Sequence, residues 1–349
     1  MRAAVYYGPG DIRIEDAPRP TVVGSGDVLI AVSKAAICGS DSSEWDHGPV
    51  LAVPPVILGH EFVGVIEEVG SQVTGLKVGD RVVSGAGISC GSCEWCQEGR
   101  TNLCDKYFTL GLQVNGGLAE YVVSPASICR RVPANLDDVS AALVQPFAVA
   151  LHGLRRAKVR SGASVAIIGV GGIGGFLIAG AAARGASHII AIDIDEARLK
   201  GASDLGATHV VNASKVDATV RVLEITGGLG AHSIVEATGV KGNPQQALDM
   251  VRRGGDVLVL GLHTGVSEVN LLQFTLREID LHGTLAHVCA EDIPEALEIL
   301  STSNFASQVR DRVISLDELV PQGIMPLVKR TAKGKIVVDL LQQERDEHV

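Results

Sequence analysis

The sequence predicts a β plus α/β fold, in which a β-barrel-like module is joined to a module with a doubly wound parallel sheet. Two observations predict this fold. Short strands separated by Pro and Gly fill residues 1–149, and apolar strands alternate with helices from residue 150 onward. The length of 349 residues also suits about two domains, each with enough material for a core.

The expected strands are apolar runs bounded by turn residues. They span residues 27–32, 61–69, 80–84 and 118–123 in the first module, and 165–168, 188–192, 209–211, 233–236, 256–260 and 279–285 in the second. Repeated strand and helix units imply a parallel sheet. We expect a helix over 294–300 and a strand over 335–340 to return the chain to the first module.

The stretch from Ser164 to Gly175 predicts a buried strand, a tight turn and the start of a helix. Its glycines follow the pattern G-x-G-x-x-G, which brings bare backbone and a helix amino terminus close to a pyrophosphate. The residues expected to hold the nucleotide are Gly169, Gly171, Gly172, Ile173 and Gly174. The alternatives are an S-adenosylmethionine methyltransferase and a glycine turn that binds nothing.

Asp193 ends the next apolar strand, about 20 residues beyond the glycines, where an acid holds a ribose diol. A carboxylate there would repel the extra phosphate of NADP, and no arginine replaces it, so we expect NAD. Arg198 is also expected among the cofactor-binding residues.

The charge of the chain limits its partners. Forty acidic against thirty basic residues give a net charge of −10. Nucleic acids and membrane surfaces both need a basic face, so we expect neither as a partner and favour a small molecule. The absence of a long apolar segment leads us to expect a cytoplasmic protein.

Four of the seven cysteines lie within residues 90–104. The spacing C-x2-C-x2-C-x7-C of Cys90, Cys93, Cys96 and Cys104 predicts a closed thiolate shell for a structural zinc ion, with an iron–sulfur cluster as the alternative. The odd count argues against a disulfide framework. The remaining motif-free cysteines, Cys129 and Cys289, are expected to be buried thiols.

A second constellation is dispersed along the first module. Cys38 follows an expected strand, and His60 and Glu61 are adjacent. One thiolate, one imidazole and one carboxylate form a ligand set typical of catalytic zinc, with the fourth position open. Each residue alone is explained better by packing or by surface exposure, so the hypothesis rests on their joint occurrence.

Taken in order, the motifs resemble those of zinc-dependent medium-chain alcohol and polyol dehydrogenases, in the branch of the sorbitol, butanediol and threonine enzymes. The similarity spans nearly the whole chain. The motifs are Ile37-Cys38-Gly39-Ser40-Asp41, Gly59-His60-Glu61-Phe62-Val63-Gly64, the four-cysteine lobe, Gly79-Asp80-Arg81-Val82, Gly117-Leu118-Ala119-Glu120-Tyr121, Pro146, the glycine turn with Asp193, Gly206-Ala207-Thr208 and Glu236-Ala237-Thr238-Gly239.

The resemblance implies two domains. A GroES-like catalytic domain would comprise residues 1–149 and 289–349, with a structural zinc lobe at about 88–106. A Rossmann NAD-binding domain would comprise residues 150–288, and the active site would lie between the two. It further implies NAD and two zinc ions per chain, and a homodimer or homotetramer formed through the edge of the Rossmann sheet.

The resemblance also implies roles for single residues. Cys38, His60 and Glu61 would bind the catalytic zinc, and Ser40 would accept or relay the proton of an alcohol whose hydride passes to the nicotinamide. The nicotinamide would lie beside residues 237–239 and 260–262, so Thr238 and Leu262 are expected in the cofactor site.

Two positions depart from the family pattern. Gln145 stands where the polyol branch usually has a glutamate, so it is expected as a weak ligand or as a residue behind the ligands. Ser43 replaces a histidine that passes the proton outward, and His47 is the nearby substitute, although an exposed loop histidine explains it better. Trp45 and Phe147 could line the substrate pocket or simply pack, and His152 could lie beside the pyrophosphate or only pack.

The sequence therefore predicts an oxidoreductase that interconverts a secondary alcohol, diol or sugar alcohol and its ketone. The alternatives are a relative without catalytic zinc that reduces activated carbonyls or alkenes, and a non-catalytic NAD-binding protein. The change at Gln145 supports the first alternative, and the joint presence of Cys38, His60 and Glu61 argues against the second.

Overall fold

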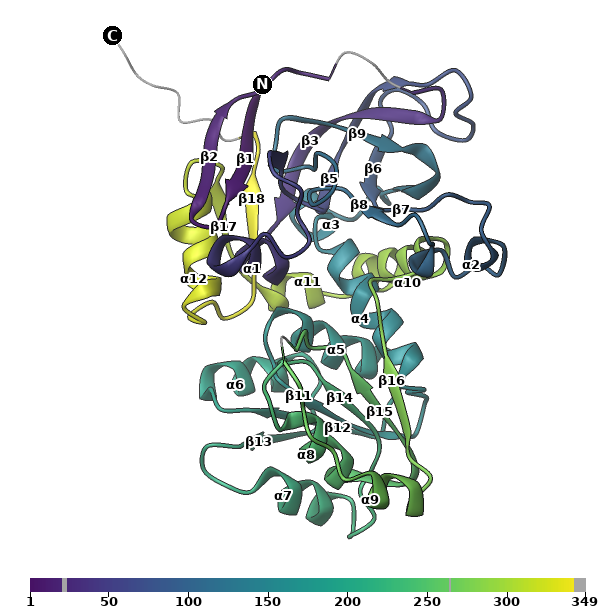
Figure 1. The fold of residues 1–349 in the computed structure, drawn as a ribbon, viewed down its shortest axis with the longest axis vertical. Coiled ribbons are helices and arrows are strands. Elements are labelled where there is room, and N and C mark those ends of the chain that lie inside the picture. Colours follow the sequence, from purple (N-terminus) through teal and green to yellow (C-terminus); the bar gives the residue numbers. More distant parts are fainter. Residues whose placement is uncertain (21–23, 264, 342–349) are drawn as a thin grey trace. The chain divides into compact units, whose positions relative to one another are not determined.

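The computed structural model describes residues 1–20, 24–263 and 265–341, which form two compact units (Figure 1). The first unit comprises Met1–Pro146, Val288–Ala306 and Arg310–Val349, and the second comprises Phe147–His287 with Ser307–Val309. Residues 342–349, the end of the predicted catalytic domain, lie outside the described residues. No helix in the described part of the chain is both long enough and apolar enough to cross a bilayer.

The first unit is mainly antiparallel β structure. One sheet has the order β2-β1-β4, a larger one has the order β10-β6-β5-β3-β18-β17 with β9 also paired to β3, and β7 pairs with β8. The strands are β1 (Arg2–Gly8), β2 (Asp11–Asp16), β3 (Asp27–Ala36), β4 (Val56–Ile57), β5 (Glu61–Val69), β6 (Arg81–Ser84), β7 (Gly87–Ile88), β8 (Phe108–Thr109), β9 (Tyr121–Pro125), β10 (Cys129–Arg131), β17 (Arg310–Ser315) and β18 (Lys335–Asp339).

Short helices connect these strands. They are α1 (Gly39–His47), α2 (Glu94–Gln97), η1 (Thr101–Leu103), η2 (Ala126–Ile128), α3 (Asp138–Ala141), α10 (Cys289–Thr302), η3 (Leu319–Ile324) and α12 (Met325–Val328), while α4 (Val144–Arg156) and α11 (Phe305–Val309) contain residues of both units. The C-terminal strand β18, yellow in Figure 1, pairs with the purple β3, with Val337 opposite Ala36. The last part of the chain thus completes a sheet that the first part begins.

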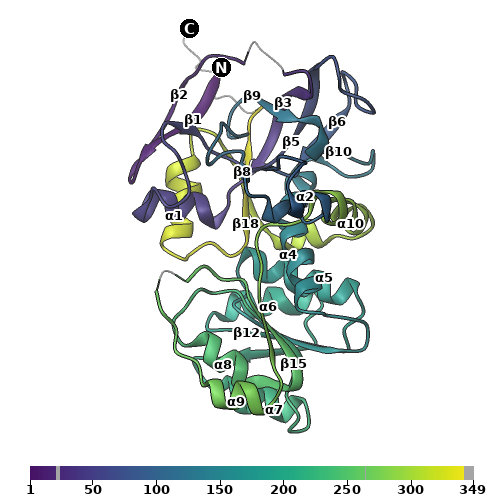
Figure 2. The same cartoon turned by 45° about the vertical axis from the view of Figure 1, so that its right-hand side comes forward.

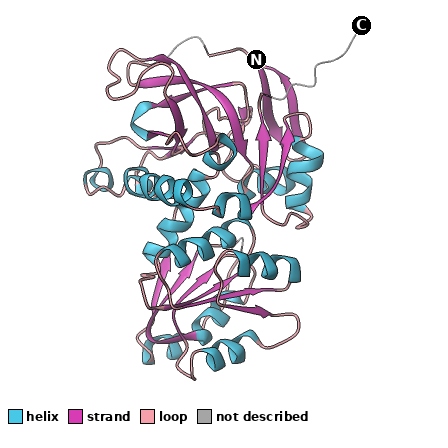
Figure 3. Ribbon diagram, turned by 180° about the vertical axis from the view of Figure 1, so that it is seen from behind, coloured by secondary structure: helices cyan, strands magenta, loops and turns pink. Residues whose placement is uncertain are grey.

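The second unit contains one parallel sheet with the order β13-β12-β11-β14-β15-β16. Its elements are β11 (Ser164–Ile168), α5 (Gly172–Ala183), β12 (His188–Asp193), α6 (Glu196–Asp204), β13 (His209–Asn212), α7 (Ala218–Ile225), β14 (Ala231–Glu236), α8 (Asn243–Met250), β15 (Val251–Val259), α9 (Leu271–Leu276) and β16 (Asp280–Gly283). Helices α5 and α6 cover one face of the sheet, and α7 and α8 cover the other (Figures 1 and 2). The view from behind also shows helices on both faces of the strands (Figure 3). This is the doubly wound Rossmann arrangement, so the predicted fold class is confirmed.

Burial explains why the central strands form. All five residues of β11 are buried, because helices cover both faces of the sheet. The order of the strands reverses between β11 and β14, and a doubly wound sheet binds its ligand at such a point, beyond the carboxyl ends of the strands. The glycine turn that begins at Gly169 lies at this point.

Several element boundaries differ from the expected ones. The strand expected over 118–123 begins at Tyr121, because Leu118 is already engaged in backbone hydrogen bonds with Leu58 and Ala4. The helix expected to begin at Pro294 begins five residues earlier, at Cys289. The carboxylate of Asp292 accepts a hydrogen bond from the N–H of Val288 (2.7 Å) and stabilises this earlier start.

Candidate functional site

Strand pairing brings the dispersed Cys38, His60 and Glu61 together. Ala36, the last residue of β3, lies opposite Glu61, the first residue of β5. Cys38 follows β3 by two residues and His60 precedes β5 by one, so the three side chains meet at the same end of the strand pair. Their sulfur, nitrogen and oxygen ligand atoms lie within 4.8 Å of one another.

Asp41 supports this group from helix α1. Its Oδ2 accepts a hydrogen bond from the N–H of Cys38 at 2.9 Å, which caps the helix. Its Oδ1 lies 3.9 Å from Nδ1 of His60, and neither of these buried atoms has a hydrogen-bond partner in the described chain. A carboxylate facing one ring nitrogen orients the imidazole and leaves Nε2 available to a metal.

Lys335 supports the group from the far end of the chain. Its ammonium lies 2.5 Å from Oε2 of Glu61 and donates a hydrogen bond to the carbonyl of Ile37 at 2.8 Å. The lysine is 5% exposed and Glu61 is 1% exposed. A buried carboxylate is therefore matched by a buried cation that also holds the backbone just before Cys38.

Opposing effects determine the protonation of His60. Burial lowers the pKa of His60, but the negative charges of Cys38 and Asp41 outweigh it and raise the pKa to about 10. Burial raises the pKa of Asp41, and the nearby His60 partly offsets this rise. Without a metal, His60 therefore carries a proton at neutral pH.

The residues around the group support a zinc site. The donor set of one thiolate, one imidazole and one carboxylate leaves one tetrahedral position open, as in catalytic zinc sites. The carboxylate of Asp41, 3.9 Å from Nδ1 of His60, occupies the place where metal-bound histidines commonly have a carboxylate, carbonyl or water. Cys38, His60 and Glu61 thus fit the metal.

Ser40 lies next to the same histidine. Its Oγ is 3.4 Å from Nε2 of His60. One turn later, the Ser43 hydroxyl donates to the carbonyl of Gly39 at 3.1 Å. His47, the last residue of α1, is exposed as predicted, and its Nδ1 lies 3.5 Å from the carboxylate of Asp46.

The remaining predicted residues are placed as follows. Gln145 lies in the first turn of α4 and is buried, and His152 is also buried in α4. Trp45 is half-buried in α1. Phe147 is fully buried, and its ring packs against Phe176 with the centroids 5.2 Å apart. The structure therefore places Phe147 in the core of the second unit.

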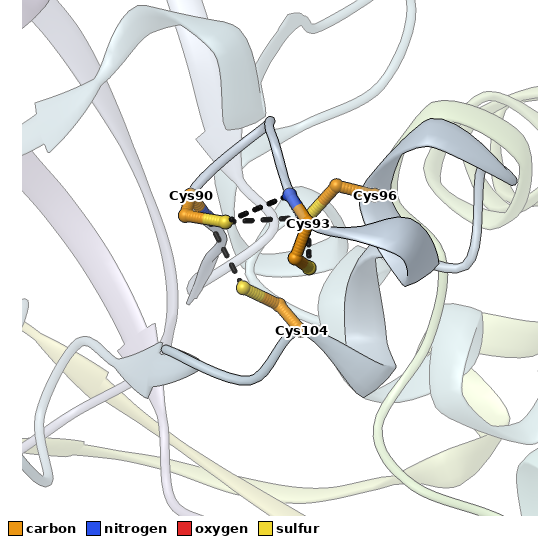
Figure 4. A group of neighbouring side chains, drawn as sticks. All are labelled: Cys90, Cys93, Cys96 and Cys104. Carbon is orange, nitrogen blue, oxygen red and sulfur yellow. Dashed lines mark hydrogen bonds between the residues drawn. The ribbon is translucent and has the colours of Figure 1, made fainter.

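The four clustered cysteines form a second, separate group (Figure 4). Two of the sulfur–sulfur distances are 4.0 Å, from Cys90 to Cys96, and 3.5 Å, from Cys93 to Cys96. A tetrahedron with zinc–sulfur bonds of about 2.3 Å has edges of about 3.8 Å, so the spacing suits zinc. Backbone N–H groups point at the sulfurs, for example from Cys90 to Cys104 at 3.2 Å, and stabilise thiolates there.

The glycine turn of the second unit has the shape of a phosphate cradle. Gly169 has a φ of +94°, and a Cβ on Gly174 would lie 2.0 Å from the carbonyl oxygen of Gly169. Both positions therefore require glycine. A Cβ on Gly171, which caps α5, would meet nothing within 4 Å, so this backbone borders open space beside the helix amino terminus. Gly172 and Ile173 form the first turn of α5.

Asp193 holds the same turn from the neighbouring strand. Its Oδ2 accepts the N–H of Val170 at 2.7 Å, and its Oδ1 accepts the N–H of Ile194 at 2.7 Å. Oδ1 also accepts the N–H of Asp195 at 3.0 Å, and since an ionised carboxylate has about four acceptor positions, about one remains for a ligand hydroxyl. Arg198 lies in the first turn of α6, three residues after the N-cap Asp195, whose carboxylate accepts its backbone N–H at 3.0 Å.

Glu236 organises the turn after β14, a role that the sequence did not reveal. This fully buried carboxylate accepts the N–H of Thr238 at 2.8 Å and lies 2.9 Å from Nε2 of His263. A Cβ on Gly239 would lie 2.4 Å from the carbonyl oxygen of Leu262, so the two predicted cofactor segments are in close contact. The Leu262 side chain itself is exposed.

Asp41 and Lys335 also contact the predicted ligands, and sequence reasoning did not predict these contacts. Asp41 had a local signal, because an acid three residues after a helix N-cap is a capping position. Lys335 had none, since it is far from Glu61 in sequence. A third group of possible metal ligands comprises Asp256, Asp280 and His282. Lys158 already pairs with both carboxylates, at 2.9 and 2.6 Å, so a cation is present there without a metal.

Comparison with known proteins agrees with this geometry. Residues 24–134 match the alcohol dehydrogenase GroES-like domain, and residues 172–302 match the zinc-binding dehydrogenase family. The chain is 37% identical over 307 residues to sorbitol dehydrogenase of Bacillus subtilis, covering 86% of each protein. It is 35% identical over 291 residues to D-xylulose reductase A of Aspergillus oryzae, covering 81% of each.

A solved structure extends the likeness to the whole fold. The crystal structure of 2R,3R-butanediol dehydrogenase from Bacillus subtilis matches with a TM-score of 0.90 and 31% identity, over 97% of this chain and 99% of that one. The sequence motifs, the two folds and these relatives agree, and the chain belongs to the zinc-dependent medium-chain alcohol and polyol dehydrogenase family.

Proposed function

We propose that this protein is an NAD-dependent dehydrogenase that interconverts a diol or sugar alcohol and the corresponding ketone. The observation that carries the proposal is the meeting of Cys38, His60 and Glu61, with their ligand atoms within 4.8 Å. The names of the relatives, which include sorbitol and butanediol dehydrogenases, support a substrate with neighbouring hydroxyl groups. The first unit would carry the catalytic site, and the second would bind the cofactor.

The chain's own residues would divide the work. Zinc held by Cys38, His60 and Glu61 would supply Lewis acidity toward the alcohol oxygen, and NAD would supply the hydride acceptor. Ser40, whose Oγ lies 3.4 Å from His60 Nε2, would accept the hydroxyl proton and pass it toward solvent. Asp41 and Lys335 would hold the ligands in place.

Gln145 would act behind the ligands or as a weak ligand. It is neutral, so the proposed centre carries one negative charge fewer than a centre with glutamate there. A more electropositive centre lowers the pKa of a bound hydroxyl group, and it also binds the metal less tightly. Gln145→Glu should therefore retain zinc better against a chelator.

The cofactor preference follows from Asp193. Its carboxylate lies at the end of β12, beside the turn formed by Gly169 and Val170. An acid there accepts the ribose hydroxyls of NAD and repels the phosphate of NADP. We expect kcat/KM to be higher with NAD than with NADP, and Asp193→Ala to reduce this ratio. A wild-type preference for NADP would contradict the assignment.

We further propose a homodimer or homotetramer formed through the edge strand β16. The neighbouring helix α9 exposes three leucines: Leu271, Leu272 and Leu276 are 65%, 65% and 62% exposed. An unpaired strand edge beside exposed apolar residues suits pairing with a second copy. Light scattering on the wild type and on Leu272→Glu tests this, since a monomeric wild type would refute it. The cytoplasmic location also stays a prediction.

Metal content and turnover together test the proposed function. We expect two zinc ions per chain in the wild type and one in Cys38→Ser, with NADH production from diols, sugar alcohols or threonine lost in the variant. Cys129→Ser is the matched control, because that buried thiol belongs to neither metal group. One zinc ion in the wild type and unchanged activity in Cys38→Ser would instead support a reductase without catalytic zinc.

A further inference from the structure

A cavity lies in the Rossmann unit at the amino ends of its strands, whereas the glycine turn lies beyond their carboxyl ends. It has a volume of about 310 Å³ and is bordered by residues at the amino ends of four strands: Ser164 of β11, His188 of β12, His232 of β14 and Arg252 of β15. The glycine turn follows the carboxyl end of β11, roughly 15 Å away at about 3.3 Å per residue. The cavity is therefore distinct from the proposed cofactor site.

Hydrogen bonds determine the tautomer of His232 at this cavity. Its Nδ1 accepts the backbone N–H of Ser164 at 3.2 Å, and the Ser164 hydroxyl lies 2.7 Å from the same nitrogen. A nitrogen that accepts an N–H carries no proton, so the proton of the neutral ring is on Nε2. His232 thus offers a donor on the side of its ring away from Ser164.

Arg252 adds a charged donor. It borders the cavity, and its Nε is buried without a hydrogen-bond partner among the described residues. A buried guanidinium N–H without a partner is costly, and an anion would satisfy it. Burial lowers the pKa of His232, and the positive charges of Arg252 and Arg160 lower it further, so the nearby charges that act on this histidine are cationic.

Part of the cavity lining is apolar. Ile225 and Leu229, from the end of α7 and the loop after it, belong to the lining, and Leu229 is 77% exposed. The Thr226 hydroxyl is already used, since it donates to the carbonyl of Val222 at 2.8 Å. A ligand that fills the cavity therefore needs an anionic group for Arg252 and His232 and a small apolar body for the leucine and isoleucine.

We propose that this cavity binds a small organic phosphate, with the phosphate on Arg252 and His232 Nε2 and the organic group against Ile225 and Leu229. Guanidinium groups suit phosphate because they present parallel N–H donors to its oxygens. The site does not depend on zinc or on hydride transfer, so it stands apart from the proposed dehydrogenase activity.

Calorimetric titration of the zinc-loaded protein with phenyl phosphate tests the proposal. The titration is carried out with and without saturating NAD. We expect binding that survives NAD and that weakens at least about tenfold in Arg252→Gln, the loss typical of one hydrogen bond to a charged group. Arg253→Gln is the matched control, because Arg253 is exposed and donates to the carbonyl of Leu276 instead. Inorganic phosphate should bind more weakly than phenyl phosphate.

A second variant keeps the test independent of folding. Leu229→Asp places a negative charge at an exposed rim position, so it should leave the unfolding temperature unchanged and weaken binding. Binding that NAD abolishes would place the phosphate in the glycine turn and overturn the proposal. The proposal would also be overturned if wild type, Arg252→Gln and Leu229→Asp bound phenyl phosphate with equal affinity. Equal affinities of the wild type for inorganic phosphate and phenyl phosphate would overturn it as well, because the apolar contact would then contribute nothing.

Discussion

The ammonium group of Lys335 lies 2.5 Å from Oε2 of Glu61, and both side chains are buried. The strands that carry them do not pair with each other, because β3 lies between β18 and β5. The same lysine donates to the carbonyl of Ile37, one residue before Cys38. One buried cation thus links two segments that supply proposed zinc ligands.

Lys335→Met should therefore destabilise both the fold and the metal site. Removing one partner of a buried ion pair leaves the other charge unpaired, which costs about 3–5 kcal/mol in the free energy of unfolding. Urea unfolding measures this loss, and chelator competition measures zinc affinity. The control is Lys34→Met, which breaks the neighbouring pair with Asp339 (2.8 Å) and should leave zinc affinity unchanged. Equal zinc affinity in Lys335→Met and wild type would contradict the prediction.

Asp41→Asn should weaken zinc binding while the protein stays folded. The amide oxygen can still accept the N–H of Cys38, but the charge that faces His60 Nδ1 is lost. Loss of a group that orients a ligand typically costs 10–100-fold in metal affinity. Competition with a fluorescent chelator measures it. An unchanged zinc affinity would show that Asp41 only caps the helix.

Zinc binding at Cys38, His60 and Glu61 should strengthen with pH. In the metal-free protein the pKa of His60 is raised to about 10, so zinc must displace a proton from this residue, and its affinity should rise about tenfold per pH unit per proton up to that pH. His60→Gln should reduce this slope by one proton. Chelator competition between pH 6 and 10 measures both slopes, and equal slopes would refute the assignment.

The same shift has an opposite effect on the stability of the metal-free fold. The folded pKa of His60 lies above its ordinary value of 6.5. Protonated His60 therefore stabilises the metal-free protein fully below pH 6.5, and this contribution is lost as the pH rises through about 10. Urea unfolding of the metal-free protein should show this fall, and His60→Gln should reduce it.

The cysteines should differ sharply in reactivity once zinc is removed. Hydrogen bonds from the backbone and hydroxyl of Ser92 lower the pKa of Cys90 to about 6, whereas burial raises the pKa of Cys129 to about 12 and that of Cys289 to about 11. After chelation at pH 7.5, iodoacetamide should label Cys90 and spare the two buried thiols. Peptide mass mapping reads this out, and rapid labelling of Cys129 in folded protein would contradict it.

Two substitutions in the glycine turn should separate folding from cofactor binding. Gly171→Ala adds a Cβ into open space at an ordinary φ of −76°, so stability should change by less than about 0.5 kcal/mol while NAD affinity falls about tenfold. Gly174→Ala places its Cβ 2.0 Å from a carbonyl oxygen and should destabilise the fold itself. Thermal unfolding measures stability, and NADH fluorescence titration measures cofactor affinity. Normal cofactor binding by Gly171→Ala would show that this turn is not the phosphate-binding site.

The local patterns of the sequence determined much of this protein. Apolar runs such as Val165–Ile168 predicted the parallel sheet, because burial on both faces requires continuous hydrophobicity. The four clustered cysteines and the glycine turn were equally visible, since their chemistry depends on residues close in sequence. Cys38, His60 and Glu61 were predicted as a group from residue type and from a family resemblance, and the strand pairing brings them together.

Only the tertiary structure revealed the residues that support these sites. Lys335 reaches Glu61 because β18 returns to pair with β3, and no local pattern encodes that pairing. Glu236 looks like an ordinary strand-end acid until the segment with His263 folds over it. Arg252 and His232 border one cavity only because parallel strands align their amino ends. Hydrophobic periodicity is a local property, whereas the pairing of buried charges depends on which distant strands become neighbours.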